Sequence, residues 1–301
     1  METSPFNAVH TVGDGPIMIL VTGATGKLGR LVVEGLLKKL PAQQIALAVR
    51  NPEKAADFAA RGIQVRRADY SKPDTLESAF AGAEKVLLIS SNEVGQRLAQ
   101  HRAAVAAAKK AGVRLLAYTS ILHADTSGLA LAAEHKGTEQ LIRDSGIPFV
   151  FLRNGWYTEN YTENLAPALA HGAIVGSSGE GRIAVATRAD YAAAAVAVLT
   201  GTGHENKVYE LGGDTALTLT DLAAEVSRQS GKTIVYKNLP PDQYQGVLTQ
   251  AGVPGPFAEV LVDSDLGAAR GELNDSSGDL RRLIGRPTTP LANAVSAALQ
   301  R

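Results

Sequence analysis

Three glycines at a spacing of three residues, Gly23, Gly26 and Gly29, form a pattern that could hold phosphate groups. An apolar run at residues 17–20 precedes them and an amphipathic run at residues 31–37 follows, which predicts a strand, a turn and a helix. The first glycine permits the bend, the second lets a pyrophosphate approach the backbone, and the third lets the helix pack on the strand. The free N–H groups at the helix start then face the phosphates. The pattern indicates a dinucleotide site, and the alternative is a purely structural turn.

The turn also limits the kind of nucleotide that could bind. A P-loop is excluded, because that motif requires four residues between its glycines and a Ser or Thr after the lysine. In this chain Lys27 is followed by Leu28. The expected contacts with the dinucleotide are the residues of the turn itself: Gly23, Ala24, Thr25, Gly26, Lys27 and Leu28.

Arg50 directly follows a second apolar run, residues 45–49, and Lys54 lies one turn further on. In folds that bind dinucleotides the residue at this place meets the adenosine ribose, and an acidic side chain there binds the 2′-hydroxyl of NAD. A guanidinium suits the 2′-phosphate of NADP instead. The position of Arg50 favours NADP, and the alternative is a solvated surface arginine.

Asp69 and Tyr70 follow a third predicted strand, residues 64–68. In this fold that place borders the adenine, where a carboxylate can accept a hydrogen bond from the exocyclic amine and a ring can stack. The alternative is a helix N-cap and a core tyrosine ahead of a helix at residues 73–80.

Ser90, Ser91 and Asn92 follow a fourth predicted strand, residues 85–89. This strand lies next to the first one, where the strand order of such a sheet reverses and ligands bind. Hydroxyl and amide groups there can bind the nicotinamide ribose. The alternative is ordinary turn chemistry.

Residues 154–161 are rich in aromatic side chains, although aromatic residues make up only 5% of the chain, and they include its one tryptophan, Trp156. Aromatic rings beside amides suit a flat, partly polar ligand. The alternative is an aromatic cluster that joins two lobes of the fold, and both can hold together.

A proton donor is harder to find. Reductases of this fold commonly carry a tyrosine and, four residues later, a lysine on one helix face, and the helix predicted at residues 128–143 lacks that pair. It carries His135 and Glu139 at the same spacing. Glu139 could orient the imidazole and favour its protonated form, and the alternative is a surface ion pair. Nucleophile and zinc motifs are missing, so neither a catalytic triad nor a metal site is expected.

The missing tyrosine–lysine pair favours an acceptor that needs little help from an acid. A ketone benefits strongly from a positioned proton donor, whereas a quinone accepts a hydride readily and gives a stabilised hydroquinone. Holding two flat rings face to face then supplies much of the catalysis through proximity and orientation. The residues thus favour quinone reduction.

Strand and helix patterns alternate along the chain, which predicts a doubly wound, mostly parallel α/β sheet. Further strands are predicted at residues 113–119, 147–152 and 207–211, further helices at 96–111 and 220–229, and a glycine-rich loop at 172–181. The expected division is a flexible extension at 1–16, an NADP-binding domain at 17–154, and a segment at 155–301 that completes the sheet and forms a smaller substrate-covering lobe.

The composition of the chain argues against several classes of protein. Basic and acidic residues are equal at 30 each, so no charge excess points to nucleic acid. The chain has no cysteine, which fits a reducing compartment. The N-terminal segment lacks the order of a signal peptide, and the longest apolar run is too short to cross a membrane. We therefore expect a cytoplasmic protein without membrane insertion.

Several of these motifs together resemble one family. The glycine turn, residues 49–52, residues 88–95 and residues 152–160 are similar to the NmrA-like atypical short-chain dehydrogenases, and within them to the type 2 bacterial NADPH-dependent quinone oxidoreductases. Residues 123–127 and 187–191 add to the likeness. The resemblance extends from residue 17 to the C-terminus. It implies an atypical Rossmann fold, NADPH as reductant and quinones as acceptors, without flavin.

The resemblance also implies where the cofactor lies and which residues take part in the reaction. It places NADPH on the glycine turn, on Arg50, on residues 90–92 and on a last group: Gly155, Trp156, Tyr157, Thr158, Glu159 and Asn160. The candidates for catalysis are His135, Asn154 and Tyr157. A rival function comes from the same superfamily, which includes NmrA-type redox sensors that bind the dinucleotide and regulate a protein partner. Because many proteins of this fold associate, a homodimer is plausible.

Overall fold

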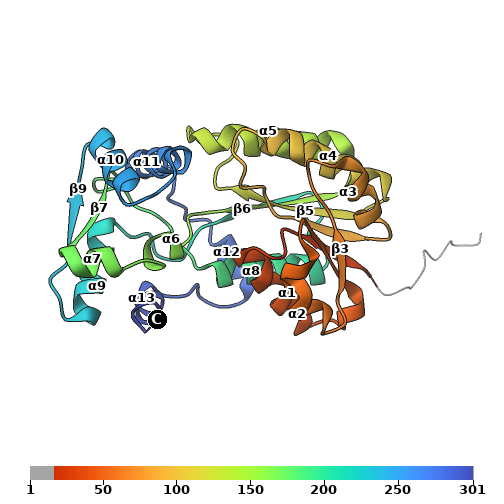
Figure 1. Ribbon diagram of the computed structural model, residues 1–301, viewed down its shortest axis with the longest axis horizontal. Helices are drawn as coiled ribbons and strands as arrows, with labels where there is room; N and C mark the ends of the chain where they lie inside the picture. Colours follow the sequence, from red (N-terminus) through yellow and green to blue (C-terminus); the bar gives the residue numbers. More distant parts are fainter. Residues whose placement is uncertain (1–16, 301) are drawn as a thin grey trace, which may run out of the picture.

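A computed structural model describes residues 17–300, so the extension predicted at residues 1–16 lies outside the described residues. Within that range seven strands form one sheet in the order β3-β2-β1-β4-β5-β6-β8, and every pairing is parallel (Figure 1). The strands are β1 (Ile19–Thr22), β2 (Ile45–Val49), β3 (Gln64–Arg67), β4 (Lys85–Leu88), β5 (Leu115–Ile121), β6 (Phe149–Asn154) and β8 (Lys207–Leu211). The order reverses between β1 and β4, which opens a crevice at their carboxyl ends. The predicted doubly wound α/β fold is confirmed.

Helices cover both faces of this sheet, which explains why the central strands are apolar throughout rather than alternating. Every residue of β1 and β2 is buried. One face is covered by α3 (Pro73–Phe80), α4 (Arg97–Lys110) and α5 (Ala130–Ser145). The other is covered by α1 (Lys27–Leu37), η1 (Ala42–Gln44), η2 (Pro52–Ala55), α2 (Ala56–Ala59), α8 (Arg188–Thr200) and α12 (Asp279–Ile284) (Figure 1).

Helix α8 brings the second half of the chain back against the first. Thr187 and Asp190 form a capping box at its start. Its small residues let it pack closely on α1, where a Cβ at Gly35 would lie 2.8 Å from Cγ2 of Val196. Strand β8 also belongs to the second half and pairs with β6.

A smaller lobe lies beyond the carboxyl end of β6, on the left in Figure 1. It contains a two-stranded parallel sheet, β7 (Ala173–Gly176) with β9 (Val235–Asn238). Its helices are α6 (Glu159–Thr162), α7 (Ala166–His171), α9 (Leu219–Ser230), α10 (Pro241–Gln250), α11 (Gly255–Ala269) and α13 (Leu291–Leu299). A third apolar core holds the lobe together and includes Ile121, Ala124, Leu129 and Ala132, so it also joins the lobe to the main sheet.

Several sequence predictions differ from the structure, and β5 spans Leu115–Ile121 rather than the predicted residues 113–119. The loop predicted at residues 172–181 contains β7, which pairs with a strand some sixty residues away and so leaves no local signal. The predicted strand at residues 147–152 begins two residues later, because Pro148 has no N–H group to give the ladder, and only its carbonyl accepts a bond, from the N–H of Leu116 at 2.9 Å.

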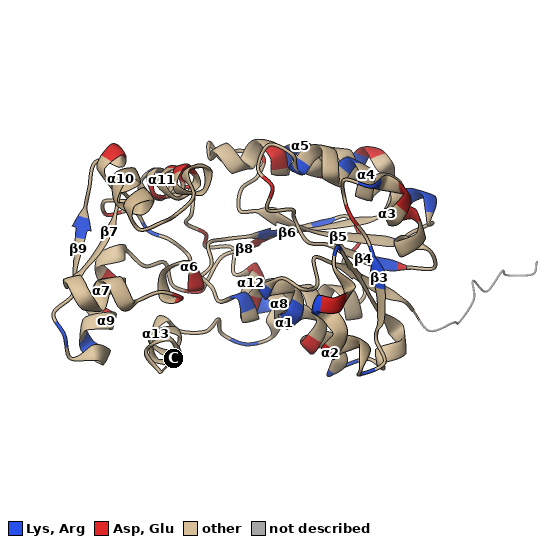
Figure 2. Ribbon diagram, in the orientation of Figure 1, with Lys and Arg blue, Asp and Glu red and all other residues tan. Residues whose placement is uncertain are grey.

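Basic and acidic segments are interspersed over both parts of the fold (Figure 2). Among residues 17–300 no helix is both long and apolar enough to span a membrane. The same residues contain no cluster of three or more acidic or histidine side chains placed to hold a metal ion.

Candidate dinucleotide-binding cleft

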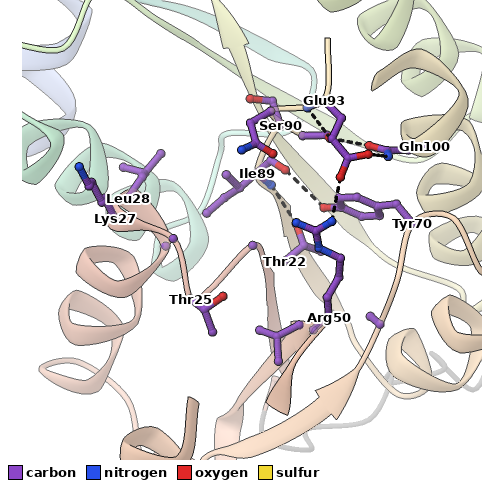
Figure 3. A pocket seen from close by; sticks show the side chains of 18 of the residues that line it. Thr22, Thr25, Lys27, Leu28, Arg50, Tyr70, Ile89, Ser90, Glu93 and Gln100 are labelled. Atoms are coloured by element: carbon purple, nitrogen blue, oxygen red, sulfur yellow. Dashed lines mark hydrogen bonds and ion pairs between the residues drawn. The ribbon is translucent and has the colours of Figure 1, made fainter. Parts of the chain in front are cut away.

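A cleft of about 690 Å³ opens at the carboxyl ends of β1, β2, β3 and β4, where the strand order reverses (Figure 3). Many residues singled out in the sequence line it: Gly23, Thr25, Gly26, Lys27, Leu28, Arg50, Asp69, Ser90, Ser91, Asn92 and Tyr157. They come from the segments that follow five strands, β1, β2, β3, β4 and β6, so the fold gathers at one place groups that are far apart in the sequence.

The glycine turn has the backbone geometry that its spacing predicts. Gly23 adopts a positive φ of 60°, which favours glycine. A Cβ at Gly29 would lie 2.4 Å from the carbonyl oxygen of Gly23, so only glycine allows α1 to pack this closely on the turn. The N–H of Gly26 donates to that same carbonyl at 3.0 Å. Ala24 is fully buried beneath the turn.

The start of α1 fits an anionic group. The helix begins at Lys27, and its first turn contains no acidic side chain that would occupy the positive end of the dipole. Gly26, Lys27 and Leu28 line the cleft at this point. Backbone N–H groups at a helix start bind phosphate well. The cleft therefore fits a dinucleotide pyrophosphate.

Arg50 crosses the cleft from the end of β2 and meets Glu93, which follows β4 (Figure 3). The guanidinium Nη1 donates to Oε1 of Glu93 at 2.8 Å. Two thirds of the Arg50 side chain, 66%, is exposed. The other carboxylate oxygen of Glu93 accepts from Nε2 of Gln100 at 2.7 Å, and Gln100 in turn accepts from the hydroxyl of Ser91.

The loop after β4 is fixed by buried polar groups. The N–H of Ser90 donates to the hydroxyl of Thr119 at 2.8 Å. The N–H of Ser91 donates to Nε2 of His101 at 3.0 Å, so the proton of that ring lies on Nδ1, which contacts Thr138. Burial lowers the pKa of His101 to about 3, which keeps the ring neutral. Sequence reasoning missed His101, whose only signal is a lone histidine in an alanine-rich helix.

Asp69 and Tyr70 both lie at the cleft, but their polar atoms also have local partners. Oδ1 of Asp69 accepts from the N–H of Ser71 at 3.0 Å, and Lys72 rather than Asp69 occupies the N-cap of α3. The hydroxyl of Tyr70 donates to the carbonyl of Ile89 at 3.3 Å. This hydrogen bond joins β3 to β4 across the floor of the cleft (Figure 3).

The segment after β6 reaches the cleft through Tyr157. The guanidinium of Arg188 lies 5.1 Å from the centre of its ring, and both residues line the cleft. Burial raises the pKa of Tyr157, so its hydroxyl keeps its proton. Trp156 instead packs against the core of the smaller lobe.

The remaining residues of that segment have structural partners. Both carboxylate oxygens of Glu159 accept from the N–H of Arg188 at the start of α8, at 2.9 and 3.0 Å. Asn160 accepts from the Arg188 side chain at 3.5 Å. Gly155 donates to the carbonyl of Leu211 at 2.9 Å, and Thr158 is buried.

Three buried polar atoms near the junction of the two lobes have no hydrogen-bond partner in the described part of the chain. They are Oδ1 of Asn154, Nε1 of Trp156 and Oη of Tyr161. Buried polar atoms normally have a partner, so unpaired ones are typical of places where a water or ligand binds. All three lie in the aromatic-rich segment at residues 154–161 that the sequence singled out, and Asn154 and Trp156 are also among the predicted site residues.

His135 and Glu139 do not form the pair that their spacing suggests. Nδ1 of His135 contacts the hydroxyl of Tyr118 at 2.7 Å, whereas Glu139 accepts from Ser120 at 2.7 Å and from Arg153. Burial, with Arg97 nearby, holds the pKa of His135 well below its usual range, which favours the neutral ring. Glu139 thus neither orients His135 nor favours its charged form.

Arg153 in β6 is the centre of a buried charge cluster that sequence reasoning missed. Its guanidinium donates to both oxygens of Glu139, at 2.9 and 2.8 Å. Its Nη1 also donates to Asp125 at 2.9 Å and to Glu210 at 2.7 Å. These bonds tie together α5, β6, β8 and the loop after β5. An arginine inside an otherwise apolar strand was the available signal.

Comparisons with known proteins agree with this geometry. The sequence profile of the NAD(P)H-binding family matches residues 23–202. The chain is 56% identical to "Quinone oxidoreductase 2" of Escherichia coli (strain K12) over 93% of its own length and 98% of that protein.

Two solved structures are similar over nearly their whole length. One is an NADPH-dependent quinone oxidoreductase from Escherichia coli complexed with NADPH, with a TM-score of 0.92, 56% identity and coverage of 94% of this chain and 100% of the other. The second is the triphenylmethane reductase of Citrobacter sp., with a TM-score of 0.91, 42% identity and coverage of 95% and 100%.

Proposed function

The chain belongs to the NAD(P)H-binding family, and we propose that it reduces quinones with NADPH, without a flavin. The observation that carries this proposal is the 56% identity to a quinone oxidoreductase over 98% of that protein, on a chain that has the cleft for the dinucleotide. The rival function of an NmrA-type redox sensor has less support, because this relative is an enzyme by name.

Each part of NADPH would be bound by a different group of residues of the chain. The residues of the glycine turn, from Gly23 to Leu28, would bind the pyrophosphate through backbone N–H groups. Arg50 would bind the 2′-phosphate, and Asp69 would border the adenine. Residues 90–92 would bind the ribose near the nicotinamide, and residues 155–160 would border the nicotinamide itself.

NADPH supplies a hydride to the acceptor when it is bound. The protein's part is to hold two flat rings in contact and to keep water away from them. Tyr157 lines the cleft and keeps its hydroxyl proton, and Asn154, the last residue of β6, has an amide oxygen without a hydrogen-bond partner among residues 17–300. His135 remains our third candidate, acting as a neutral ring through Tyr118.

The test is anaerobic oxidation of NADPH, followed by absorbance, with and without a simple benzoquinone or naphthoquinone. We expect oxidation that depends on the quinone. Tight binding of NADPH, measured by the fluorescence of Trp156, with no turnover on several quinones would support the redox sensor instead.

A triarylmethyl dye sharpens this test, because the name of a 42% identical relative points to that acceptor. Such a cation accepts a hydride without needing a proton, whereas a quinone must also gain one proton to become the hydroquinone. If Asn154 or Tyr157 helps to deliver a proton, Asn154→Ala or Tyr157→Phe should slow the quinone reaction more than the dye reaction. Equal losses with both acceptors would assign the residue to binding alone.

The proposal also covers the domain division, the location and the oligomeric state of the protein. We propose that residues 17–154 form the NADP-binding domain, and that residues 155–301 complete the sheet and supply the substrate lobe. We also propose a cytoplasmic homodimer. Sedimentation equilibrium of the full chain measures the assembly, and a mass equal to one chain would contradict the dimer.

A further inference from the structure

The ion pair between Arg50 and Glu93 spans the whole crevice. Arg50 follows β2 and Glu93 follows β4, and β1 lies between these two strands. A contact between the two exit loops must therefore pass over the carboxyl end of β1. Figure 3 shows the Arg50 side chain reaching across the cleft to Glu93.

Two hydrogen bonds, one to the carboxylate and one from the backbone, hold Glu93 in place. Nε2 of Gln100 donates to Oε2 at 2.7 Å, and the hydroxyl of Ser91 accepts from the N–H of Glu93 at 3.2 Å. Gln100 and Ser91 are themselves buried, at 7% and 8% exposed. Glu93 is thus fixed by a built network rather than by a chance surface contact.

We propose that Glu93 is a cofactor-selecting residue that competes with the 2′-phosphate of NADPH for Arg50. The inference rests on the proposed role of Arg50. Without a 2′-phosphate the guanidinium is neutralised by Glu93, and with one it lies between two anionic groups. Their mutual repulsion lowers the affinity for NADPH and leaves the affinity for NADH unchanged.

If Glu93 only positioned Arg50, removing its charge would weaken the binding of NADPH, whereas competition predicts tighter binding. Glu93 reduces the preference for NADPH that Arg50 creates, so the pair together sets the ratio between the two cofactors. Because 42% of the Glu93 side chain is exposed, water and salt screen the repulsion and keep it modest.

The experiment is a binding titration of NADPH, NADH and the fragment 2′,5′-ADP, on the full chain and without any quinone. Since no turnover is needed, failure of the proposed quinone activity would not affect it. We expect Glu93→Gln to bind NADPH and 2′,5′-ADP about two- to tenfold more tightly at low salt. Binding of NADH should stay within twofold.

A second pair of variants isolates the competition. In a chain that already carries Arg50→Met, no guanidinium remains for which Glu93 and the 2′-phosphate could compete. In that chain Glu93→Gln should raise the affinity for NADPH by less than half as much as it does in the original chain. Glu53→Gln is the matched control. It removes a negative charge three residues from Arg50 that makes no ion pair with Arg50 among residues 17–300.

Four results would overturn the inference. Weaker binding of NADPH by Glu93→Gln would assign Glu93 to positioning Arg50. An equal gain for NADPH and NADH would assign the effect to the general charge of the cleft, as would an equal gain from Glu53→Gln. A full gain in the Arg50→Met background would show that Arg50 is not the group for which Glu93 competes.

Discussion

Arg50 and Arg153 both lie near the carboxyl edge of the sheet, but their surroundings are opposite. The Arg50 side chain is 66% exposed, and its one carboxylate partner among residues 17–300 is Glu93. The Arg153 side chain is 5% exposed. Its carboxylate partners within the same range are three: Glu139, Asp125 and Glu210. The raised pKa of Arg153 reflects these partners against the opposing effect of burial.

The comparison teaches that burial and partners, rather than residue type, separate an arginine that we propose for a ligand from an arginine that holds the fold together. The donors of Arg153 are taken up by carboxylates inside the molecule. Among residues 17–300 the guanidinium of Arg50 donates a hydrogen bond only through Nη1, so its other donors can meet a phosphate at the rim of the cleft. The substitutions below separate the two roles.

Arg153→Met should have the largest effect. Removing the cation leaves Glu139, 2% exposed, with Arg143 at 3.3 Å and the hydroxyl of Ser120 as its remaining partners among residues 17–300. The loss of the buried pair should cost about 3 kcal/mol in free energy of unfolding, the lower end of the usual range, because Arg143 offsets part of the buried charge. Urea unfolding measures the loss. The ratio of NADPH to NADH affinity should not change. A changed ratio in a folded variant would contradict the assignment of Arg153 to stability and of Arg50 to cofactor binding.

Asp265 shows what a buried carboxylate does when no arginine pairs with it in the described part of the chain. It is 4% exposed, and burial raises its pKa to about 6, although its Oδ2 accepts from the N–H of Ser177 at 2.7 Å. From about pH 4 to pH 6 the folded state keeps a proton that the unfolded state has lost. This carboxyl group therefore lowers the stability by about 3 kcal/mol as the pH rises through that window.

Asp265→Asn tests that pH dependence, because the amide keeps an acceptor for Ser177 and cannot titrate. Relative to the original chain, the variant should gain about 3 kcal/mol between pH 4 and pH 7, measured by urea unfolding at each pH. A difference that is constant with pH would mean that Asp265 is charged in the folded state throughout.

Arg50→Met should weaken the binding of NADPH by about 10- to 100-fold, the size of a lost charge-assisted hydrogen bond of about 1.5–3 kcal/mol. The affinity for NADH and the free energy of unfolding should stay nearly unchanged. Titration of both cofactors measures the effect. Equal losses for NADPH and NADH would remove Arg50 from its proposed role.

Tyr118→Phe should have the smallest effect. It removes the hydrogen bond to Nδ1 of His135 and costs about 1 kcal/mol in free energy of unfolding. If His135 acts through Tyr118, kcat for a quinone should fall as well. An unchanged kcat would leave the pair with a structural role only.

The first half of the fold could be predicted from the sequence because its signals are local. The glycine turn gives the position of the cleft, and Arg50 is placed by the strand that precedes it. The order of β1 to β6 follows from alternation and handedness. The boundary of β6 shifted because Pro148 has no N–H group to give the ladder, and that of β5 shifted with it, since the two strands pair along their length.

What the sequence could not predict depends on contacts between distant residues. Glu139 lies at helical spacing from His135, yet its partner is Arg153, because a buried carboxylate is stabilised most by a buried cation. Strand β7 was not predicted because its partner β9 follows three intervening elements. Glu93 stood in a recognised motif, but only the sheet order places it opposite Arg50.

The most direct test of the central claim, direct reduction of quinones by NADPH in this cleft, is a single-turnover reaction with NADPH deuterated at C4. Single turnover isolates the chemical step from product release. We predict a primary isotope effect on oxidation of the cofactor for one of the two C4 positions, in protein whose visible spectrum shows no flavin. Quinone reduction that requires added flavin, or proceeds without an isotope effect at either position, would contradict the account.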